Sequence, residues 1–162
     1  MITLKSAHEI ELMRRAGKIT AAARAVARDM VKPGVTTQQI DKAVHRFITE
    51  QGAIPSFLHY NGYPASVCVS VNDEIIHGIP GDRVLHEGDI VSVDVGARYR
   101  GFNGDCAGTF PCGQCSDEAL RLIRITRQSF FEGIRFARVG YRISDIGHAI
   151  QDYAESYGYS LV

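Results

Sequence analysis

Asp94 and Asp105 are two carboxylates on segments whose residue pattern is typical of neighbouring strands. In residues 90–96 three valines alternate with Ile, Ser, Asp and Gly, so one face of the expected strand is apolar and the other carries Asp94. Residues 102–110 place Asp105 on their more polar face in the same way. If residues 97–101 form the connection, the strands are a hairpin and the carboxylates lie nearly opposite, with Cβ atoms roughly 5 Å apart.

Carboxylates this close repel each other, so either one of them is protonated or a cation lies between them. Carboxylate oxygens are hard ligands that suit divalent ions of Mg, Mn, Fe, Co or Zn, and a bridging carboxylate can hold two such ions roughly 3.5 to 4 Å apart. The spacing alone leaves a second interpretation open, in which both aspartates flank turns on a solvated hairpin face.

Cys112 and Cys115 form a Cys-x-x-Cys pair between an expected strand and an expected helix. A helix N-terminus lowers the pKa of a thiol, so a thiol oxidoreductase is one interpretation. A zinc site that adds Cys68 and Cys106 is another, although one of the two usual Cys-x-x-Cys knuckles is missing. The redox fold needs a partner strand after its helix, and two helices follow here, so we favour an incidental pair of free thiols.

Helical and extended segments must position these residues. Ser6 and Glu9 form a capping box that starts the first helix, and Pro33 with Gly34 stops it. Apolar spacing and turn residues predict helices over residues 6–31, 37–51, 116–138 and 144–157. Short apolar runs broken by Gly, Pro, Asn and Asp predict strands within residues 66–110, at 66–71, 74–79, 89–97 and 102–110.

A shift of 106 positions places the first pair of helices on the second pair. Gly34 then falls on Gly140, and Gly52 falls on Gly158. The order helix, break, helix, glycine therefore occurs twice, although any two amphipathic helices that end at a glycine would match about as well.

The motifs around the two aspartates resemble those of the methionine aminopeptidase and prolidase metallopeptidases, and most closely the type I, bacterial-type methionine aminopeptidases. The resemblance runs over essentially the whole chain. The residues that carry it are Asn61-Gly62-Tyr63-Pro64, Ser66-Val67-Cys68, Ile76-His77-Gly78-Ile79-Pro80, Leu85-x-x-Gly88-Asp89-Ile90-Val91-x-x-Asp94 and Gly104-Asp105.

The resemblance implies the α+β pita-bread fold, an antiparallel sheet covered by helices with two halves related by a pseudo-twofold axis. The 106-residue repeat agrees with it. We expect one incomplete catalytic domain over residues 1–162, with a first half at about 1–111, the start of a second half at about 116–162, and the strands of that half beyond Val162.

The resemblance also implies roles for individual residues. Asp94 would chelate one of two divalent ions (Co, Mn, Fe or Zn) and Asp105 would bridge both, while His77 would contact the substrate beside the scissile bond as a catalytic residue. The pocket for the methionine side chain would be lined by Tyr60, Tyr63 and Cys68. The carbonyl of Asn72 would bind a structural monovalent cation.

The implied activity is removal of the N-terminal methionine from nascent proteins and peptides by a metal-bridged hydroxide, with a transient ribosome contact and a monomeric state. The family's remaining metal ligands, one His and two Glu, have no match here, so we expect these 162 residues alone to be inactive. The alternative is a non-catalytic pita-bread binding protein or an inactive fragment. The other histidines, His8, His45, His59, His86 and His148, are expected to be solvated.

The amino-acid composition limits the kinds of partner that the protein can bind. The 162 residues are 45% apolar, and 18 Lys and Arg balance 18 Asp and Glu. A net charge of zero argues against nucleic acid, whose phosphates are bound by clustered basic residues. No apolar run approaches the roughly 18 residues needed to span a membrane, and the N-terminus lacks a signal-peptide pattern, so we expect a cytoplasmic protein.

Overall fold

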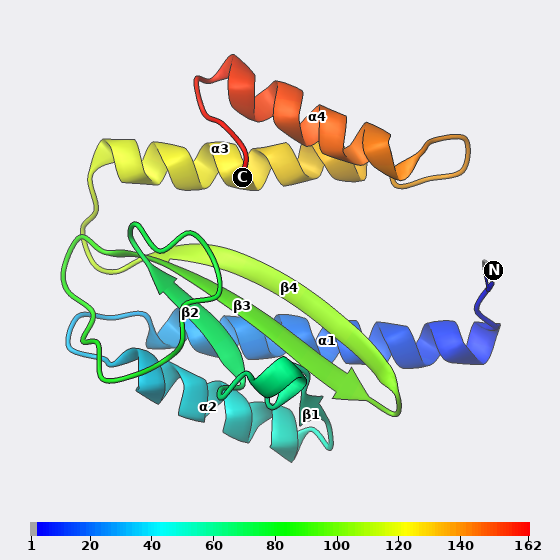
Figure 1. Ribbon diagram of the computed structural model, residues 1–162, viewed down its shortest axis with the longest axis horizontal. Helices are drawn as coiled ribbons and strands as arrows, with labels where there is room; N and C mark the ends of the chain where they lie inside the picture. The colour runs from blue at the N-terminus through cyan, green and yellow to red at the C-terminus, as the bar shows by residue number, and fades with distance from the viewer. Residues whose placement is uncertain (1–2) are drawn as a thin grey trace. The chain divides into compact units, whose positions relative to one another are not determined.

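The computed structural model describes residues 3–162, which form two compact units that meet in sequence at Cys115 and Ser116 (Figure 1). The first unit contains two helices and a four-stranded sheet: α1 (Ala7–Met30), α2 (Thr37–Glu50), β1 (Ile54–Pro55), a single 3-10 turn (Tyr60–Gly62), β2 (Val67–Val71), β3 (Ile90–Tyr99) and β4 (Phe102–Pro111). The second unit contains α3 (Asp117–Ile134) and α4 (Ile143–Ser156).

Both helices of the first unit begin at reciprocal caps. The Ser6 hydroxyl accepts a hydrogen bond from the Glu9 amide at 3.3 Å, and the Glu9 carboxylate accepts one from the Ser6 amide at 2.7 Å. Thr36 and Gln39 repeat the arrangement at the start of α2. The capping box expected from the sequence therefore fixes where α1 starts.

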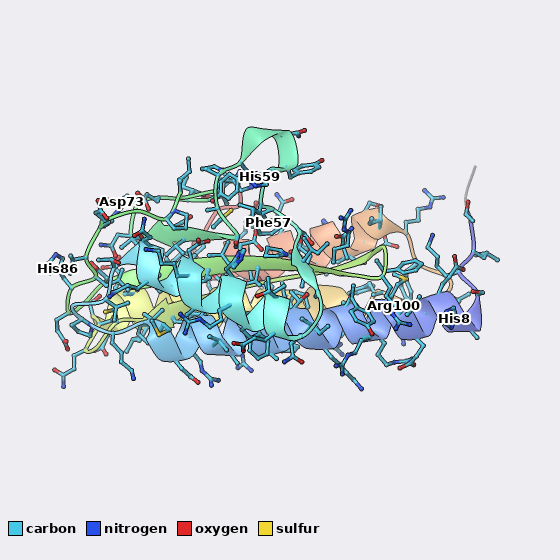
Figure 2. All side chains as sticks on the ribbon, turned by 90° about the horizontal axis from the view of Figure 1, so that it is seen from below. His8, Phe57, His59, Asp73, His86 and Arg100 are labelled. Atoms are coloured by element: carbon cyan, nitrogen blue, oxygen red, sulfur yellow. The ribbon has the colours of Figure 1, made fainter. Side chains whose placement is uncertain are left out.

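The sheet is antiparallel and β3 is its centre (Figure 1). β4 pairs with β3 along its whole length, and β2 and β1 pair with its other edge. The apolar face of β3 carries Val91, Val93 and Val95, which are fully buried against residues of α1 and α2 such as Ile40. Figure 2 shows these helices on one side of the sheet and the segment of Phe57 and His59 on the other.

A close helix contact fixes α1 against β4. A Cβ atom at Gly104 would lie 2.6 Å from the Thr20 hydroxyl and 2.8 Å from the Ala16 carbonyl oxygen, so only glycine fits there. Since Gly104 directly precedes Asp105, this contact also fixes the position of the Asp105 backbone relative to α1.

The connection between β3 and β4 is tighter than the expected loop over residues 97–101. β3 continues to Tyr99, and the turn consists of Arg100 and Gly101, whose φ values are 47° and 90°. Two residues with positive φ match the right-handed twist of a hairpin. The consequence for register is that Asp94 faces Ala107 and not Asp105.

The strand expected at residues 74–79 is absent, and an irregular loop runs there instead. His77 has a φ of 58°, in the left-handed region that interrupts a strand. One backbone hydrogen bond, from the Val69 amide to the Gly78 carbonyl, joins the end of this loop to β2, and another, from the Glu74 amide to the Val71 carbonyl, joins its beginning. The apolar residues that suggested a strand, Ile75, Ile76 and Ile79, are exposed.

The 106-residue repeat is present in the structure. α2 and α4 each contain 14 residues and are displaced by 106 positions. The glycines that flank them, Gly34 and Gly52 in one case and Gly140 and Gly158 in the other, all have positive φ. α3 is shorter than the expected helix over 116–138, because i to i+3 hydrogen bonds tighten the chain after Ile134.

Among residues 3–162, none of the helices combines the length and the apolar character required to cross a membrane.

Candidate functional site

A cavity of about 640 Å³ opens on the polar side of the sheet. The six residues singled out as candidate site residues all line it, although they come from five separate segments of the chain. They are Tyr60, Tyr63, Cys68, His77, Asp94 and Asp105.

Strand pairing builds the floor of this cavity. Cys68 on β2 is paired with Asp94 on β3, and Asp94 is paired with Ala107 on β4, so these three share one face of the sheet. Asp105 is paired with Gly96 and therefore lies diagonally from Asp94. The carboxylates face the same space, as expected for residues that lie nearly opposite, and their pairs are two register positions apart.

The electrostatics of Asp94 are unusual for a carboxyl group. Its pKa is raised from 3.8 to about 6 by burial and then by the negative charge of Asp105, while His77 acts in the opposite direction. Among the described residues, Asp94 Oδ1 is the buried side-chain oxygen or nitrogen that has no hydrogen-bond partner. Such a pair is stabilised by a proton or by a cation between the carboxylates.

These donors fit part of a metal site. Carboxylate oxygens are hard ligands, and the unpartnered Oδ1 of Asp94 points to a missing electropositive neighbour. Within residues 3–162, no three His, Cys, Asp or Glu side chains are grouped closely enough to hold a metal ion. Asp94 and Asp105 by themselves are fewer donors than a full coordination shell needs.

Tyr63 and Cys68 form an uncharged wall of the cavity. Burial is the main cause that raises the pKa of the Cys68 thiol, so the thiol stays protonated near neutral pH. Burial also raises the pKa of Tyr63, whose hydroxyl lies 3.0 Å from the Val67 carbonyl oxygen and 3.2 Å from that of Gly78. Tyr60, by contrast, is 70% exposed at the rim.

Phe57 also lines the cavity and was missed by the sequence analysis. Its ring covers Gly96, where a Cβ atom would lie only 2.7 Å from the ring Cε1. Ser56 fixes the same approach, because its amide donates to the Gly96 carbonyl at 2.9 Å. A glycine inside an alternating strand often marks a close approach, and Gly96 was the available signal.

Asp41 is a second residue that the sequence analysis missed. Its Oδ1 accepts hydrogen bonds from the amides of Ser66 at 2.7 Å and Val67 at 3.1 Å, which ties α2 to the start of β2.

His45 lies one turn after Asp41 on α2. Its Nδ1 is 2.8 Å from the Ser66 hydroxyl, and its side chain is partly buried, so the expectation of a solvated His45 was wrong. Ser66 is 1% exposed, and this cluster is structural.

The cysteine pair does not form an activated thiol site. The Cys112 side chain is fully buried, and burial raises its pKa, which is opposite to the shift that a redox thiol needs. Cys115 Sγ donates to the Asp89 carbonyl at 3.2 Å. All four cysteines are free, and no metal-binding group includes any of them among the described residues, so the zinc interpretation with Cys68 and Cys106 is not supported.

The second unit contains another cavity, of about 530 Å³, that includes none of the candidate site residues. Its arginines are engaged by neighbours, since Arg135 pairs with Glu132 at 2.8 Å and Arg138 stacks on Tyr141. The chemistry predicted from the sequence therefore gathers in the first unit.

Comparison with known proteins gave consistent results. Residues 11–162 match metallopeptidase family M24. The methionine aminopeptidase of Clostridium acetobutylicum is 52% identical over 163 aligned residues, which cover 100% of this chain and 65% of the relative. Methionine aminopeptidase 1 of Bacillus subtilis is 47% identical over 162 residues, again covering 100% and 65%.

Among solved structures, the crystal structure of methionine aminopeptidase from Rickettsia prowazekii superimposes with a TM-score of 0.97 at 41% sequence identity. It covers 100% of this chain and 65% of that one. The chain thus spans 65% of the length of these relatives.

Proposed function

The chain belongs to metallopeptidase family M24, and from this we propose that it takes part in metal-dependent removal of the N-terminal methionine from proteins and peptides. The TM-score of 0.97 over the whole chain confirms the α+β pita-bread fold expected from the sequence. The observation that carries the proposed activity is that His77, Asp94 and Asp105 line the same cavity.

The proposed metal ligands in this chain are Asp94 and Asp105. They would hold part of a pair of divalent ions of Co, Mn, Fe or Zn, since both are oxygen donors on one face of the β3–β4 hairpin. Asp105, which is exposed, would hold both ions, and Asp94, which is partly buried, would hold one. When bound, divalent ions lower the pKa of a water molecule and polarise the carbonyl group of the scissile peptide bond.

The remaining cavity residues would bind the methionine side chain. Phe57, Tyr60 and Tyr63 present aromatic rings, and Cys68 presents a neutral thiol. A thioether is flexible and makes favourable contacts with aromatic rings, so this wall suits methionine better than a charged side chain. Among the described residues that line the cavity there is no Lys or Arg, so an acidic side chain of a substrate would have no such partner there.

His77 would act on the substrate and not on the metal. Its side chain is exposed on the loop that borders the cavity, and an imidazole ring carries an N–H group that can donate a hydrogen bond. A ring N–H donated to the carbonyl oxygen of the scissile bond would stabilise the negative charge that develops there.

Further parts of the proposal concern the surroundings of the site. Asn72 has a φ of 56°, and its side chain is engaged by Asp89 and the Ile90 amide, which leaves its backbone carbonyl for a structural monovalent cation. The partners would be the N-termini of nascent chains, with a transient ribosome contact, in a monomeric cytoplasmic protein that binds neither membrane nor nucleic acid directly.

The test is release of methionine from a Met-Gly-x peptide with Co²⁺ or Mn²⁺. Two proteins are compared: the 162-residue chain, and an extended chain in which it is continued by the part of the Clostridium acetobutylicum relative that it does not cover. We expect turnover in the extended chain alone. Turnover by the 162-residue chain would contradict the need for further ligands, and no turnover by either would contradict the proposed function.

A non-catalytic binding protein is the second candidate, favoured by the lack of a three-residue metal-binding group within residues 3–162. It predicts that methionine peptides bind to the extended chain without being cleaved, which calorimetry and product analysis would distinguish.

A further inference from the structure

The part of the loop next to His77 is not held by apolar packing. The loop leaves β2 after Val71 and reaches β3 at Ile90, and Leu85 near its end is buried in the core, but the apolar side chains beside His77 are exposed. Ile75, Ile76 and Ile79 are 63%, 68% and 62% exposed. Hydrogen bonds must therefore determine where His77 lies.

Three of the hydrogen bonds that join the loop to its surroundings meet at the next residue, Gly78, while Glu74 at the start of the loop exchanges two with Val71. Its amide donates to the Ser70 hydroxyl at 3.0 Å, and its carbonyl accepts from the Val69 amide at 2.9 Å. The Tyr63 hydroxyl lies 3.2 Å from the same carbonyl oxygen. Both polar groups of the Gly78 backbone are thus attached to β2 and to the wall of the cavity.

This attachment requires an unusually close approach of two backbones. A Cβ atom at Gly78 would lie 2.2 Å from the Val69 carbonyl oxygen and 3.0 Å from the Ser70 Cα. Glycine is the residue that permits this contact, and the strained φ of 58° at His77 persists because Gly78 is fixed.

The Ser70 hydroxyl is the side-chain group of β2 that binds this loop. It is 3% exposed, it lies between Val69 and Val71 in a fully buried strand, and its hydrogen bond with the Gly78 amide is the side-chain contact seen for it among residues 3–162. Ser70 is paired with Ser92, and the next pair on the same face is Cys68 with Asp94, so Ser70 lies on the cavity face of the sheet.

We propose that Ser70 is a positioning residue that, by holding the Gly78 amide, places the His77 imidazole over the carboxylates. The role rests on the proposed function, because the position of His77 matters for turnover only if the ring contacts the substrate. Ser70 itself touches neither substrate nor metal in this proposal; it acts through the backbone of the loop.

Ser92 provides a matched control. It is the cross-strand partner of Ser70 on the same face of the sheet, and its hydroxyl is bonded to Thr109 at 2.8 Å and not to the loop. Ser70→Ala and Ser92→Ala each remove one hydroxyl from this face, but only the first removes the partner of Gly78.

The first measurement is amide hydrogen exchange by NMR on the 162-residue chain. We expect exchange of the Gly78 amide to become at least about tenfold faster in Ser70→Ala, to stay near the original rate in Ser70→Thr, and to be unchanged in Ser92→Ala. The Val93 amide, in the central strand, reports whether each variant remains folded. An unchanged rate at Gly78 in folded Ser70→Ala would overturn the proposal.

The second measurement is turnover by the extended chain. Ser70→Ala should lower kcat by about ten- to a hundredfold, as expected for a misplaced catalytic group, with KM and bound metal unchanged. Ser70→Thr should restore most of kcat, and Ser92→Ala should not lower it. Faster exchange at Gly78 with unchanged kcat would overturn the positioning role and leave the proposed function standing; absence of turnover in the unsubstituted extended chain would instead overturn the proposed function.

Discussion

Asp94 and Asp105 face one cavity from adjacent strands, with Asp94 opposite Ala107 and Asp105 opposite Gly96. This diagonal arrangement lets two carboxylates approach one point from different directions. The same arrangement leaves Asp94 with a pKa raised by burial and by its neighbour, so the site carries a cost in stability when no cation is bound.

Asp94→Asn should stabilise the metal-free chain. A carboxyl whose folded-state pKa is raised from 3.8 to about 6 disfavours the folded state once it ionises, so the cost is absent below about pH 4 and complete above about pH 6. After discounting for partial exposure, we expect a gain of about 1 kcal/mol at pH 7.5 and none at pH 4. Urea unfolding at both pH values measures it.

Asp73→Asn is the control for this comparison, because Asp73 is an exposed aspartate in the loop after β2 (Figure 2). Its free energy of unfolding should be nearly the same as that of the original chain at either pH. A loss of stability in Asp94→Asn at pH 7.5 would refute the repulsion between Asp94 and Asp105.

Asp105→Ala and His77→Ala should separate metal binding from turnover in the extended chain. Removal of the Asp105 carboxylate should abolish both, since the proposed bridging ligand is lost. Removal of the His77 imidazole should preserve metal content and lower kcat by about a hundredfold. Metal analysis after gel filtration, together with methionine release, tests both; loss of metal in His77→Ala would contradict its assignment as a substrate contact.

Gly96→Ala should be destabilising although alanine is a small residue. The added methyl group would lie 2.7 Å from the Phe57 ring and 2.9 Å from the Ser56 Cβ, so one of them must move. We expect a loss of about 1–3 kcal/mol in thermal or urea unfolding.

Gly147→Ala in α4 is the matched glycine substitution, because nothing lies within 4 Å of its added Cβ. It should be neutral, or stabilising by up to about 1 kcal/mol, through helix propensity. If both alanine variants had the same stability, the close packing of Phe57 on Gly96 would be disproved.

Asp41→Ala should weaken the start of β2. The amides of Ser66 and Val67 would lose their common acceptor in a buried place, which costs about 1–3 kcal/mol for each unsatisfied donor. Exchange of these two amides should accelerate in the variant. Asp29→Ala, which removes an exposed carboxylate of α1 that pairs with the adjacent Arg28, should change stability by less than about 0.5 kcal/mol.

Local rules predicted much of the first unit. The alternation in residues 90–96 assigned the apolar face of β3, and the Ser6 and Glu9 pair located the start of α1. The 106-residue shift was found from identities alone and reappears as equal lengths of α2 and α4. These features depend on neighbours in sequence or on simple periodicity, which is why sequence analysis could find them.

Other features depend on contacts that no local pattern encodes. The apolar run at residues 74–79 has the composition of a strand, but the approach of Gly78 to Val69 makes it a loop. Register between the aspartates depends on Arg100 adopting a positive φ, which arginine rarely does. The role of Asp41 depends on backbone amides 25 and 26 residues away.

The two-residue turn at Arg100 and Gly101 bears on the order in which the site forms during folding. A hairpin with so short a connection closes in roughly 1–10 μs, because few residues must be ordered before its first cross-strand contacts form. Contacts of Asp94 with the Tyr63 and His77 segments close much longer loops and are expected later. The acidic pair would thus exist in an early hairpin, where dissolved divalent cations can offset its repulsion before the cavity is complete.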